Sequence, residues 1–250
     1  AKGMKVFFDI ITNHTADVIS YSEGEYGYRN KTDYPYRDAS GTVFDDKAYA
    51  GKPDFPALDP DTSFAYHPVF PTTADETVKV PAWLNDRTKY HNRGDSTFAG
   101  ESSEYGDFVG LDDLFTEQAA VEQGMEDIYK AWVDFGVDGF RIDTVKHVNM
   151  EFWQKFSPAM TERAKADGNP DFFMFGEVYD ARPSVMSAFT TTGTLPNMMS
   201  ESFHEATKMK VRPPMRMTVW RTAWGTVLSS VSRTMPRSAE PKIGALRSGL

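Results

Sequence analysis

Apolar residues recur with two different periods along this chain. In one stretch they lie three or four positions apart, which predicts an amphipathic helix ending near Gly136. Elsewhere they form short β-branched and aromatic runs, which are typical of buried strands. The predicted elements are strands at about 3–11, 137–142 and 171–175 and helices at about 121–135 and 151–166. Helices that alternate with buried strands indicate an α/β fold with a parallel sheet.

Residues 15–108 break this alternation. They are rich in Tyr, Asp, Gly and Pro, and no helical period persists through them. A segment of this length is too long for an ordinary loop. We therefore interpret residues 15–108 as an irregular or small-β domain, with its own aromatic core, inserted between a first strand in residues 1–14 and further strands and helices in 109–197.

The charge pattern predicts a second boundary. The protein has a formal charge of −9, but residues 200–250 hold nine Lys and Arg against three Asp and Glu. That segment has a net charge of +6, the rest of the sequence has −15, and no Asp follows Asp180. A change this abrupt favours an atypical basic tail at 198–250 that is not native barrel. An out-of-frame coding sequence would produce such a tail.

Composition narrows the function classes. The sequence has no Cys, which excludes disulfides and thiol catalysis. A net negative charge argues against a broad nucleic-acid surface, and no apolar run approaches the ~18 residues of a membrane span. No leader sequence is visible before the first predicted strand. We expect partners that are neither nucleic acid nor membrane, such as sugars and divalent cations.

Polar residues follow three of the predicted strands. Because parallel strands open their carboxyl ends on one face, these side chains can converge there. The three clusters are Asp9, Asn13 and His14; Arg141, Asp143, Lys146 and His147; and Glu177.

Asp143 and Glu177 follow neighbouring strands and make a candidate catalytic pair. A retaining glycosidase holds two carboxyl groups about 5–5.5 Å apart. Arg141, two residues before Asp143 on the same side of the strand, is expected to lower the Asp143 pKa. An apolar setting after an aromatic strand is expected to raise the Glu177 pKa, as a general acid requires.

Four segments of the sequence resemble the α-amylase family of glycoside hydrolases. They are Asp9–His14, Leu111–Leu114, Gly139–His147 and Phe175–Val178, in the family's order. The resemblance covers residues 1–197 and implies a partial (β/α)8 TIM barrel, about strands three to five, with a long domain inserted after strand three. It also implies an α-glucan substrate and, by analogy, an extracellular enzyme.

The resemblance assigns roles to the matching positions. Asp143 would be the nucleophile, Glu177 the general acid/base, and Arg141 the group that holds the nucleophile. Substrate-side roles would fall to His14, Lys146, His147 and Asp9. A structural Ca²⁺ would take oxygen ligands from Asn13, Asp113 and the backbone carbonyl of His147, as suits a hard cation; the ligand from the inserted domain is not identifiable.

The sequence departs from the family in one essential feature. The family's third carboxylate, an Asp after an Asn-His pair, has no counterpart here, and the tail after Asp180 cannot supply it. We expect these 250 residues alone to be poorly stable and nearly inactive.

Two alternatives stay open, a non-catalytic carbohydrate-binding remnant and a calcium-dependent phosphoester hydrolase using Asp9, Asn13 and His14. Bond preference, transfer versus hydrolysis and oligomeric state cannot be read, and His67, His91 and His204 are expected to be surface or locally satisfied residues.

Overall fold

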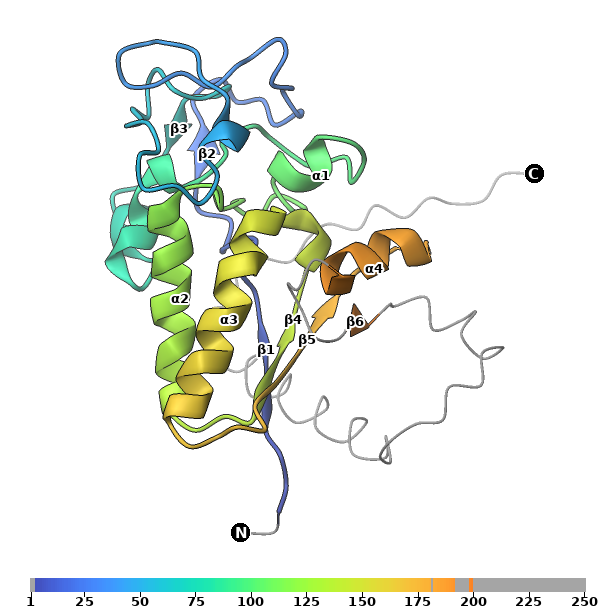
Figure 1. Ribbon diagram of the computed structural model, residues 1–250. Helices are drawn as coiled ribbons and strands as arrows, with labels where there is room; N and C mark the ends of the chain where they lie inside the picture. The colour runs from blue at the N-terminus through green and yellow to red at the C-terminus, as the bar shows by residue number, and fades with distance from the viewer. Residues whose placement is uncertain (1–2, 181, 192–197, 200–250) are drawn as a thin grey trace, which may run out of the picture. The chain divides into compact units, whose positions relative to one another are not determined.

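A parallel sheet organises the part of the protein that the computed structural model describes, namely residues 3–180, 182–191 and 198–199. Its strands lie in the order β1 (Phe7–Ile10), β4 (Gly139–Ile142), β5 (Phe173–Glu177) and β6 (Met198–Met199) (Figure 1). All three neighbouring pairs are parallel. The predicted parallel α/β architecture is therefore confirmed for these residues.

Helices connect the later strands. α2 (Ala119–Asp134) precedes β4, α3 (Met150–Ala166) joins β4 to β5, and α4 (Pro183–Thr191) follows β5. α2 and α3 lie side by side along the sheet (Figure 1). The main core lies between them and β4, where Phe140, Phe152, Trp153 and Phe156 are fully buried.

The sequence-based interpretation of the whole 121–135 stripe as core is wrong at its end. Val121, Met125 and Val133 are buried, but Trp132 is 42% exposed and Phe135 is 76% exposed. These two rings extend past the core, where the Trp132 ring packs edge-to-face with the rings of Phe8 and Phe135 at centroid distances of 5.1 and 5.9 Å. Within the described residues β1 is an edge strand, so no further element covers that corner of the helix.

A glycine permits the close packing of the three main strands. A Cβ on Gly139 would lie 2.0 Å from the carbonyl oxygen of Phe173 and 2.5 Å from the ring of Phe7. Any side chain at this position would therefore push β4 away from its neighbours. Gly139 opens the strand that carries Arg141 and leads to Asp143, so the close approach also fixes where those side chains lie.

The region at 15–108 contains little regular structure. It holds an antiparallel pair, β2 (Ser20–Tyr21) with β3 (Pro68–Val69), and the short helix α1 (Ser102–Tyr105). Among the described residues, 3-10 helices occur at Asp46–Ala48, Asp75–Thr77, Ala82–Asn85, Arg87–Lys89 and Val145–His147. A separate aromatic cluster is centred on Tyr36, Tyr105 and Phe115. Because Phe115 belongs to it, residues beyond 108 pack with this region; the domain boundaries stay a prediction.

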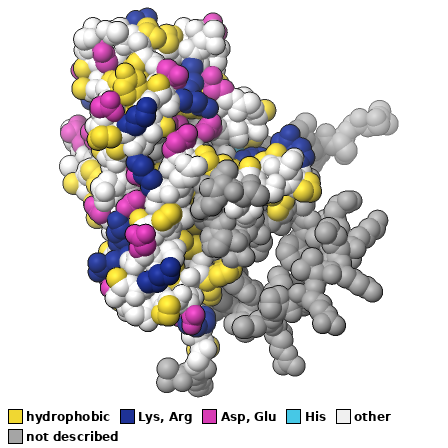
Figure 2. Space-filling view, viewed as in Figure 1, with side chains coloured by type: hydrophobic (Ala, Val, Ile, Leu, Met, Phe, Trp, Pro, Cys, Tyr) yellow, Lys and Arg dark blue, Asp and Glu magenta, His cyan; other side chains and the backbone are white. Residues whose placement is uncertain are grey.

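Acidic and basic side chains are interspersed over the face seen in Figure 2. No helix in the described ranges is both long and apolar enough to cross a membrane. β6 occupies the first two residues of the predicted tail, and residues 200–250, including His204, lie outside the described residues.

Candidate active site

Parallel pairing brings the predicted catalytic residues to one end of the sheet. Asp9 in β1 pairs with Arg141 in β4, and Arg141 pairs with Phe175 in β5. Side chains two residues apart on a strand point the same way, which places Asp143 on the side of Arg141. Glu177 is the last residue of β5.

The guanidinium of Arg141 contacts three carboxylates. Its Nη1 donates to Asp9 Oδ1 at 2.8 Å and to Asp143 Oδ1 at 2.6 Å. Its Nη2 donates to Glu177 Oε2 at 2.5 Å. Asp143 and Glu177 therefore face the same side and lie no farther apart than one guanidinium can bridge.

The three carboxylates differ in exposure. The side chain of Glu177 is 11% exposed, that of Asp143 24% and that of Asp9 41%. Burial raises the pKa of Asp9, and its hydrogen bond from Arg141 only partly offsets this. Glu177 is buried in direct contact with Arg141, which was not predicted from the sequence, and the apolar setting expected for it stays a prediction.

The backbone turns sharply after Asp143. The Asp143 N–H donates to the Ile10 carbonyl at 2.9 Å, and Thr144 adopts a left-handed conformation with φ of 51°. A non-glycine residue in this conformation is strained and persists only where its surroundings hold it. The indole of Trp153 donates to the Val145 carbonyl at 3.1 Å, so α3 fixes the turn.

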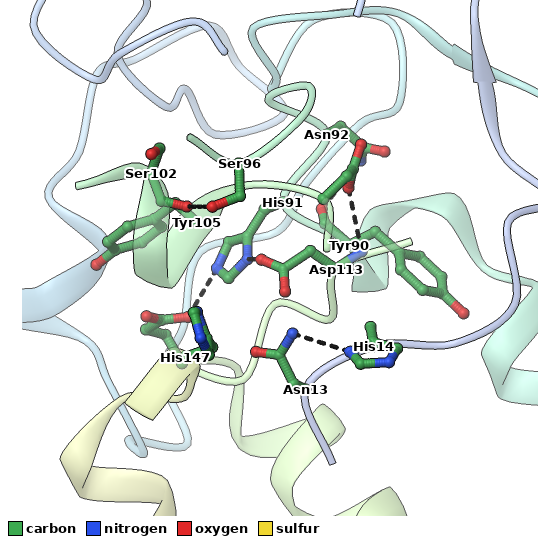
Figure 3. Close-up of polar contacts among 12 residues, drawn as sticks. Asn13, His14, Tyr90, His91, Asn92, Ser96, Ser102, Tyr105, Asp113 and His147 are labelled. Carbon is green, nitrogen blue, oxygen red and sulfur yellow. Dashed lines mark hydrogen bonds and ion pairs between the residues drawn. The ribbon is translucent and has the colours of Figure 1, made fainter. Parts of the chain in front are cut away.

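His14 lies beside this end of the sheet and is stacked on an aromatic ring. Its ring is 5.1 Å from that of Phe108, with an interplanar angle of 7°. Its Nδ1 accepts from the Asn13 amide at 3.2 Å (Figure 3). Burial lowers the pKa of His14, which favours the neutral ring, and in a neutral ring the bond from Asn13 to Nδ1 places the proton on Nε2.

His147 and Lys146 follow Asp143 but make different contacts. His147 Nδ1 donates to the Ser103 carbonyl in α1 at 2.6 Å, and burial lowers the pKa of the ring. Lys146 Nζ instead donates to the Tyr179 carbonyl at 2.8 Å and lies 3.9 Å from Asp180. His147 thus contacts the inserted region, whereas Lys146 contacts the segment after β5.

The three predicted calcium residues gather between the inserted region and the strand ends. His14 forms a β-bridge with Asp113, and the Leu114 N–H donates to the Asn13 carbonyl at 2.8 Å. Figure 3 shows the Asn13 amide oxygen on the side of His147 and one Asp113 oxygen directed toward Asn13. The described residues contain no group of three or more His, Cys, Asp or Glu that could hold a metal. An ion here would therefore depend on amide and carbonyl oxygens as well as Asp113.

His91 is a buried residue whose importance the sequence did not reveal. Its Nδ1 lies 2.6 Å from Asp113 Oδ2, and its Nε2 lies 2.9 Å from Glu117 Oε2. Burial lowers the pKa of His91, but Glu117 and Asp113 outweigh it and raise the pKa to about 9. His91 is locally satisfied, as expected, but it is only 1% exposed and is not a surface residue. No local spacing could have found it, since its partners lie 22 and 26 positions away.

The decisive comparison is with a family model. The model described as the alpha amylase catalytic domain matches residues 1–242. This chain belongs to the alpha-amylase family. The resemblance inferred from the four sequence segments is therefore confirmed, and the match extends beyond the residue 197 at which that resemblance ended.

Several relatives of this alpha-amylase family member are known. An alpha-amylase from Streptomyces lividans is 55% identical over 210 residues, which is 83% of this chain and 23% of that relative. A cyclomaltodextrin glucanotransferase from Klebsiella oxytoca is 41% identical over 83 residues, 33% of this chain and 12% of the relative. A solved Anoxybacillus alpha-amylase has a TM-score of 0.47 and 25% identity, covering 80% of this chain and 30% of that one. This chain thus spans less than a quarter of the length of its Streptomyces relative.

Proposed function

We propose that this protein holds the nucleophile and the general acid/base of a retaining glycosidase that acts on α-linked glucans. Asp143 is the nucleophile and Glu177 the acid/base. The observation that supports this most is the contact of one guanidinium, that of Arg141, with both carboxylates. A glycosidic bond between two such carboxylates can be attacked from one side and protonated from the other.

The reaction then follows two displacements. Asp143 attacks the anomeric carbon while the proton of Glu177 passes to the leaving oxygen, which forms a glycosyl ester. Water, deprotonated by Glu177, releases the sugar in the second step. Arg141 donates to Glu177 Oε2 at 2.5 Å, so this contact must open before Glu177 can reach the leaving oxygen.

The surrounding groups orient the sugar. A neutral His14 can donate from Nε2 to a sugar hydroxyl, because its Nδ1 already accepts from Asn13. Asp9 and Asp143 both accept a hydrogen bond from Arg141 Nη1, so the charge of Asp9 helps to balance that of the guanidinium. Lys146 and His147 border the leaving-group side in this proposal.

A calcium ion would fit the oxygen atoms beside this site. The candidate ligands are the amide oxygen of Asn13, the Asp113 oxygen that His91 does not contact, and the His147 carbonyl. When bound, calcium supplies positive charge between the inserted region and the strand ends. Thermal unfolding in calcium and in excess chelator tests this. A higher melting temperature in calcium is expected in the parent protein and not in Asn13→Ala; equal melting temperatures would refute it.

The finer fold assignment is also part of the proposal. β1, β4 and β5 would be strands three, four and five of a (β/α)8 barrel, and residues 15–108 the domain inserted after strand three. A polymeric glucan substrate favours an extracellular enzyme. The preference for α-1,4 or α-1,6 bonds stays open.

Covalent labelling tests the catalytic assignment directly. A 5-fluoroglucosyl fluoride of α configuration carries a leaving group that needs no acid, so the nucleophile can react even where turnover is slow. We expect a mass adduct on Asp143 in the parent protein and a longer-lived one in Glu177→Gln, which lacks the base for the second step. Asp143→Asn is the matched control and should remain unlabelled. An adduct on another residue, or none in a protein that stays folded, would contradict the assignment.

A non-catalytic glucan-binding role is the second candidate, because the sequence has no Asp beyond Asp180 to complete a catalytic triad. Asp143→Asn separates the two candidates. Unchanged affinity for maltotriose, with no labelling of the parent protein, would favour binding alone.

A further inference from the structure

Two buried lysine–aspartate pairs lie in the inserted region and its junction with the sheet. Lys79 and Asp112 have side chains only 5% and 4% exposed, and Lys31 and Asp46 have 19% and 2%. Removing two opposite charges from water is costly, and well-packed apolar side chains would often stabilise such sites as well. A buried ion pair that is present despite this cost therefore points to a role in positioning the segments that it contacts.

The first pair fixes the segment that leaves His14. Lys79 Nζ contacts the Asp112 carboxylate and donates to Thr15 Oγ1 at 2.7 Å. The Asp112 carboxylate accepts from the backbone N–H groups of Val18 and Ile19 at 3.1 and 3.2 Å.

Two further bonds complete this arrangement. The Asp112 carbonyl accepts from the Thr15 N–H at 2.9 Å. Lys79 Nζ also donates to the Tyr90 hydroxyl at 3.2 Å. Residues 15–19 are thus held at both ends, directly after His14. We name Lys79, Asp112, Thr15 and Tyr90 the His14 latch.

The second pair fixes the helix that holds His147. Lys31 Nζ donates to Asp46 Oδ1 at 2.9 Å, and the Tyr105 hydroxyl donates to Asp46 Oδ2 at 2.9 Å. Lys31 Nζ also lies 3.9 Å from the centre of the Tyr105 ring. Tyr105 ends α1, and the Ser103 carbonyl of the same helix accepts from His147 Nδ1. We name Lys31, Asp46 and Tyr105 the His147 latch.

We propose that these two latches position His14 and His147 independently, so that the inserted region sets each histidine of the active site through its own buried ion pair. The lysines and aspartates are positioning residues and do not touch the substrate. The functional consequence rests on the proposed glucan-cleaving role of the site, but the positioning itself does not.

The geometry supports independence. In the contacts described above, the His14 latch acts on the segment that follows β1 and the His147 latch acts on α1, and the two share no residue. Both histidines contact Phe108, whose ring is stacked on His14 and stands edge-on to His147 at 5.2 Å, and the charge of His147 acts on the His14 pKa. A directional ion pair fixes both position and orientation, whereas an apolar replacement of similar volume would keep the packing and lose the orientation.

Histidine-selective NMR of the full 250-residue protein, in calcium-containing buffer, tests the proposal. The sequence has five histidines, so single substitutions assign every ring resonance. In Lys79→Met/Asp112→Leu, which leaves no unpaired buried charge, we expect the contact between the His14 and Phe108 rings to weaken while the His147 resonances stay in place. In Lys31→Met/Asp46→Leu we expect the opposite.

Glu122→Leu/Lys155→Met is the matched control. This pair, at 3.2 Å, joins α2 to α3, and the half-exposed Lys155 also donates to the Gly51 carbonyl; these contacts include neither histidine, so both rings should keep their resonances. The proposal would be overturned if the ring resonances of both histidines shift in either latch variant, or if the resonances of neither histidine shift. If a double variant does not fold, Lys79→Arg and Asp46→Asn, which keep most of each latch, take its place. Each single variant should then shift the ring resonances of the histidine of its own latch only. A shift of the other histidine's resonances, or of neither set, would refute the independence of the two latches.

Maltotriose titration adds the functional readout. We expect roughly tenfold weaker affinity in the His14-latch variant, equivalent to the loss of about one hydrogen bond. Unchanged affinity despite a displaced His14 would refute the functional part. If the parent protein does not bind maltotriose, the proposed function fails, while the ring contacts still decide the positioning.

Discussion

The sheet with its helices and the inserted region are stabilised in different ways. Around β4, the core is built of large apolar side chains, with Trp153, Phe152 and Phe156 fully buried. The inserted region and its junction instead bury ionised or polar groups such as His91 and Lys79. Apolar packing around β4 is non-directional, whereas the buried polar groups of the inserted region depend on specific partners. Regular elements therefore hold the proposed catalytic carboxylates, while buried polar contacts hold the residues around them.

The largest expected effect concerns the apolar core. Trp153→Ala should destabilise the protein by about 3–5 kcal/mol, because it leaves a cavity at the centre of the α3 packing. Trp132→Ala, on the exposed end of α2, is the matched control and should cost well under half as much. Urea denaturation measures both. Equal losses in the free energy of unfolding of the two variants would mean that the core does not lie where α3 meets β4.

The next effect concerns the inserted region. His91→Ala should cost about 3 kcal/mol, because Asp113 and Glu117 would then be buried without their cation. In the His91→Ala variant, hydrogen exchange of the backbone amides should accelerate more in residues 15–118 than in β4 and α3. His67→Ala, an exposed histidine paired with Glu23, should change little. Uniform acceleration along the whole sequence would argue against two differently stabilised regions.

The difference between the regions also explains what the sequence could predict. The periodic stripe at 121–135 and the apolar run after Gly136 gave α2 and β4 to within a few residues, because burial on one face leaves a regular pattern. Asp143 and Glu177 could be chosen because they end such strands. The same pattern failed at Trp132 and Phe135, since periodicity does not reveal where a covering neighbour stops.

Residues of the inserted region could not be predicted in this way. Lys79 meets Asp112 across 33 positions, and His91 meets Glu117 across 26. Such pairs have no period, and a buried Lys looks like a surface Lys in the sequence. Even the Arg141–Glu177 contact depended on the register between β4 and β5, which neither strand specifies alone. These contacts become visible only when the fold brings the segments together.

A smaller effect tests how closely the sheet is packed. Gly139→Ala should cost about 1–3 kcal/mol, because the new methyl group would overlap the Phe173 carbonyl and β4 would have to move. Gly27→Ala in the inserted region is the control, since a Cβ there meets nothing within 4 Å. If both variants melt at the parent temperature, the close approach of β4 and β5 is wrong.

The smallest effect is a pH dependence at the start of β1. Asp138 accepts from Lys5 and from the Val6 N–H at 2.8 Å each, and these bonds lower the pKa of Asp138. Because the folded pKa lies below the unfolded value of 3.8, this contribution is present above pH 3.8 and is lost as pH falls through the folded pKa. The ion pair is exposed, so its share of stability is small and screened by salt. Asp138→Asn should therefore lower the melting temperature slightly at about pH 6 and not at all in strong acid. An equal shift at both pH values would show that the loss comes from strand geometry and not from the charge.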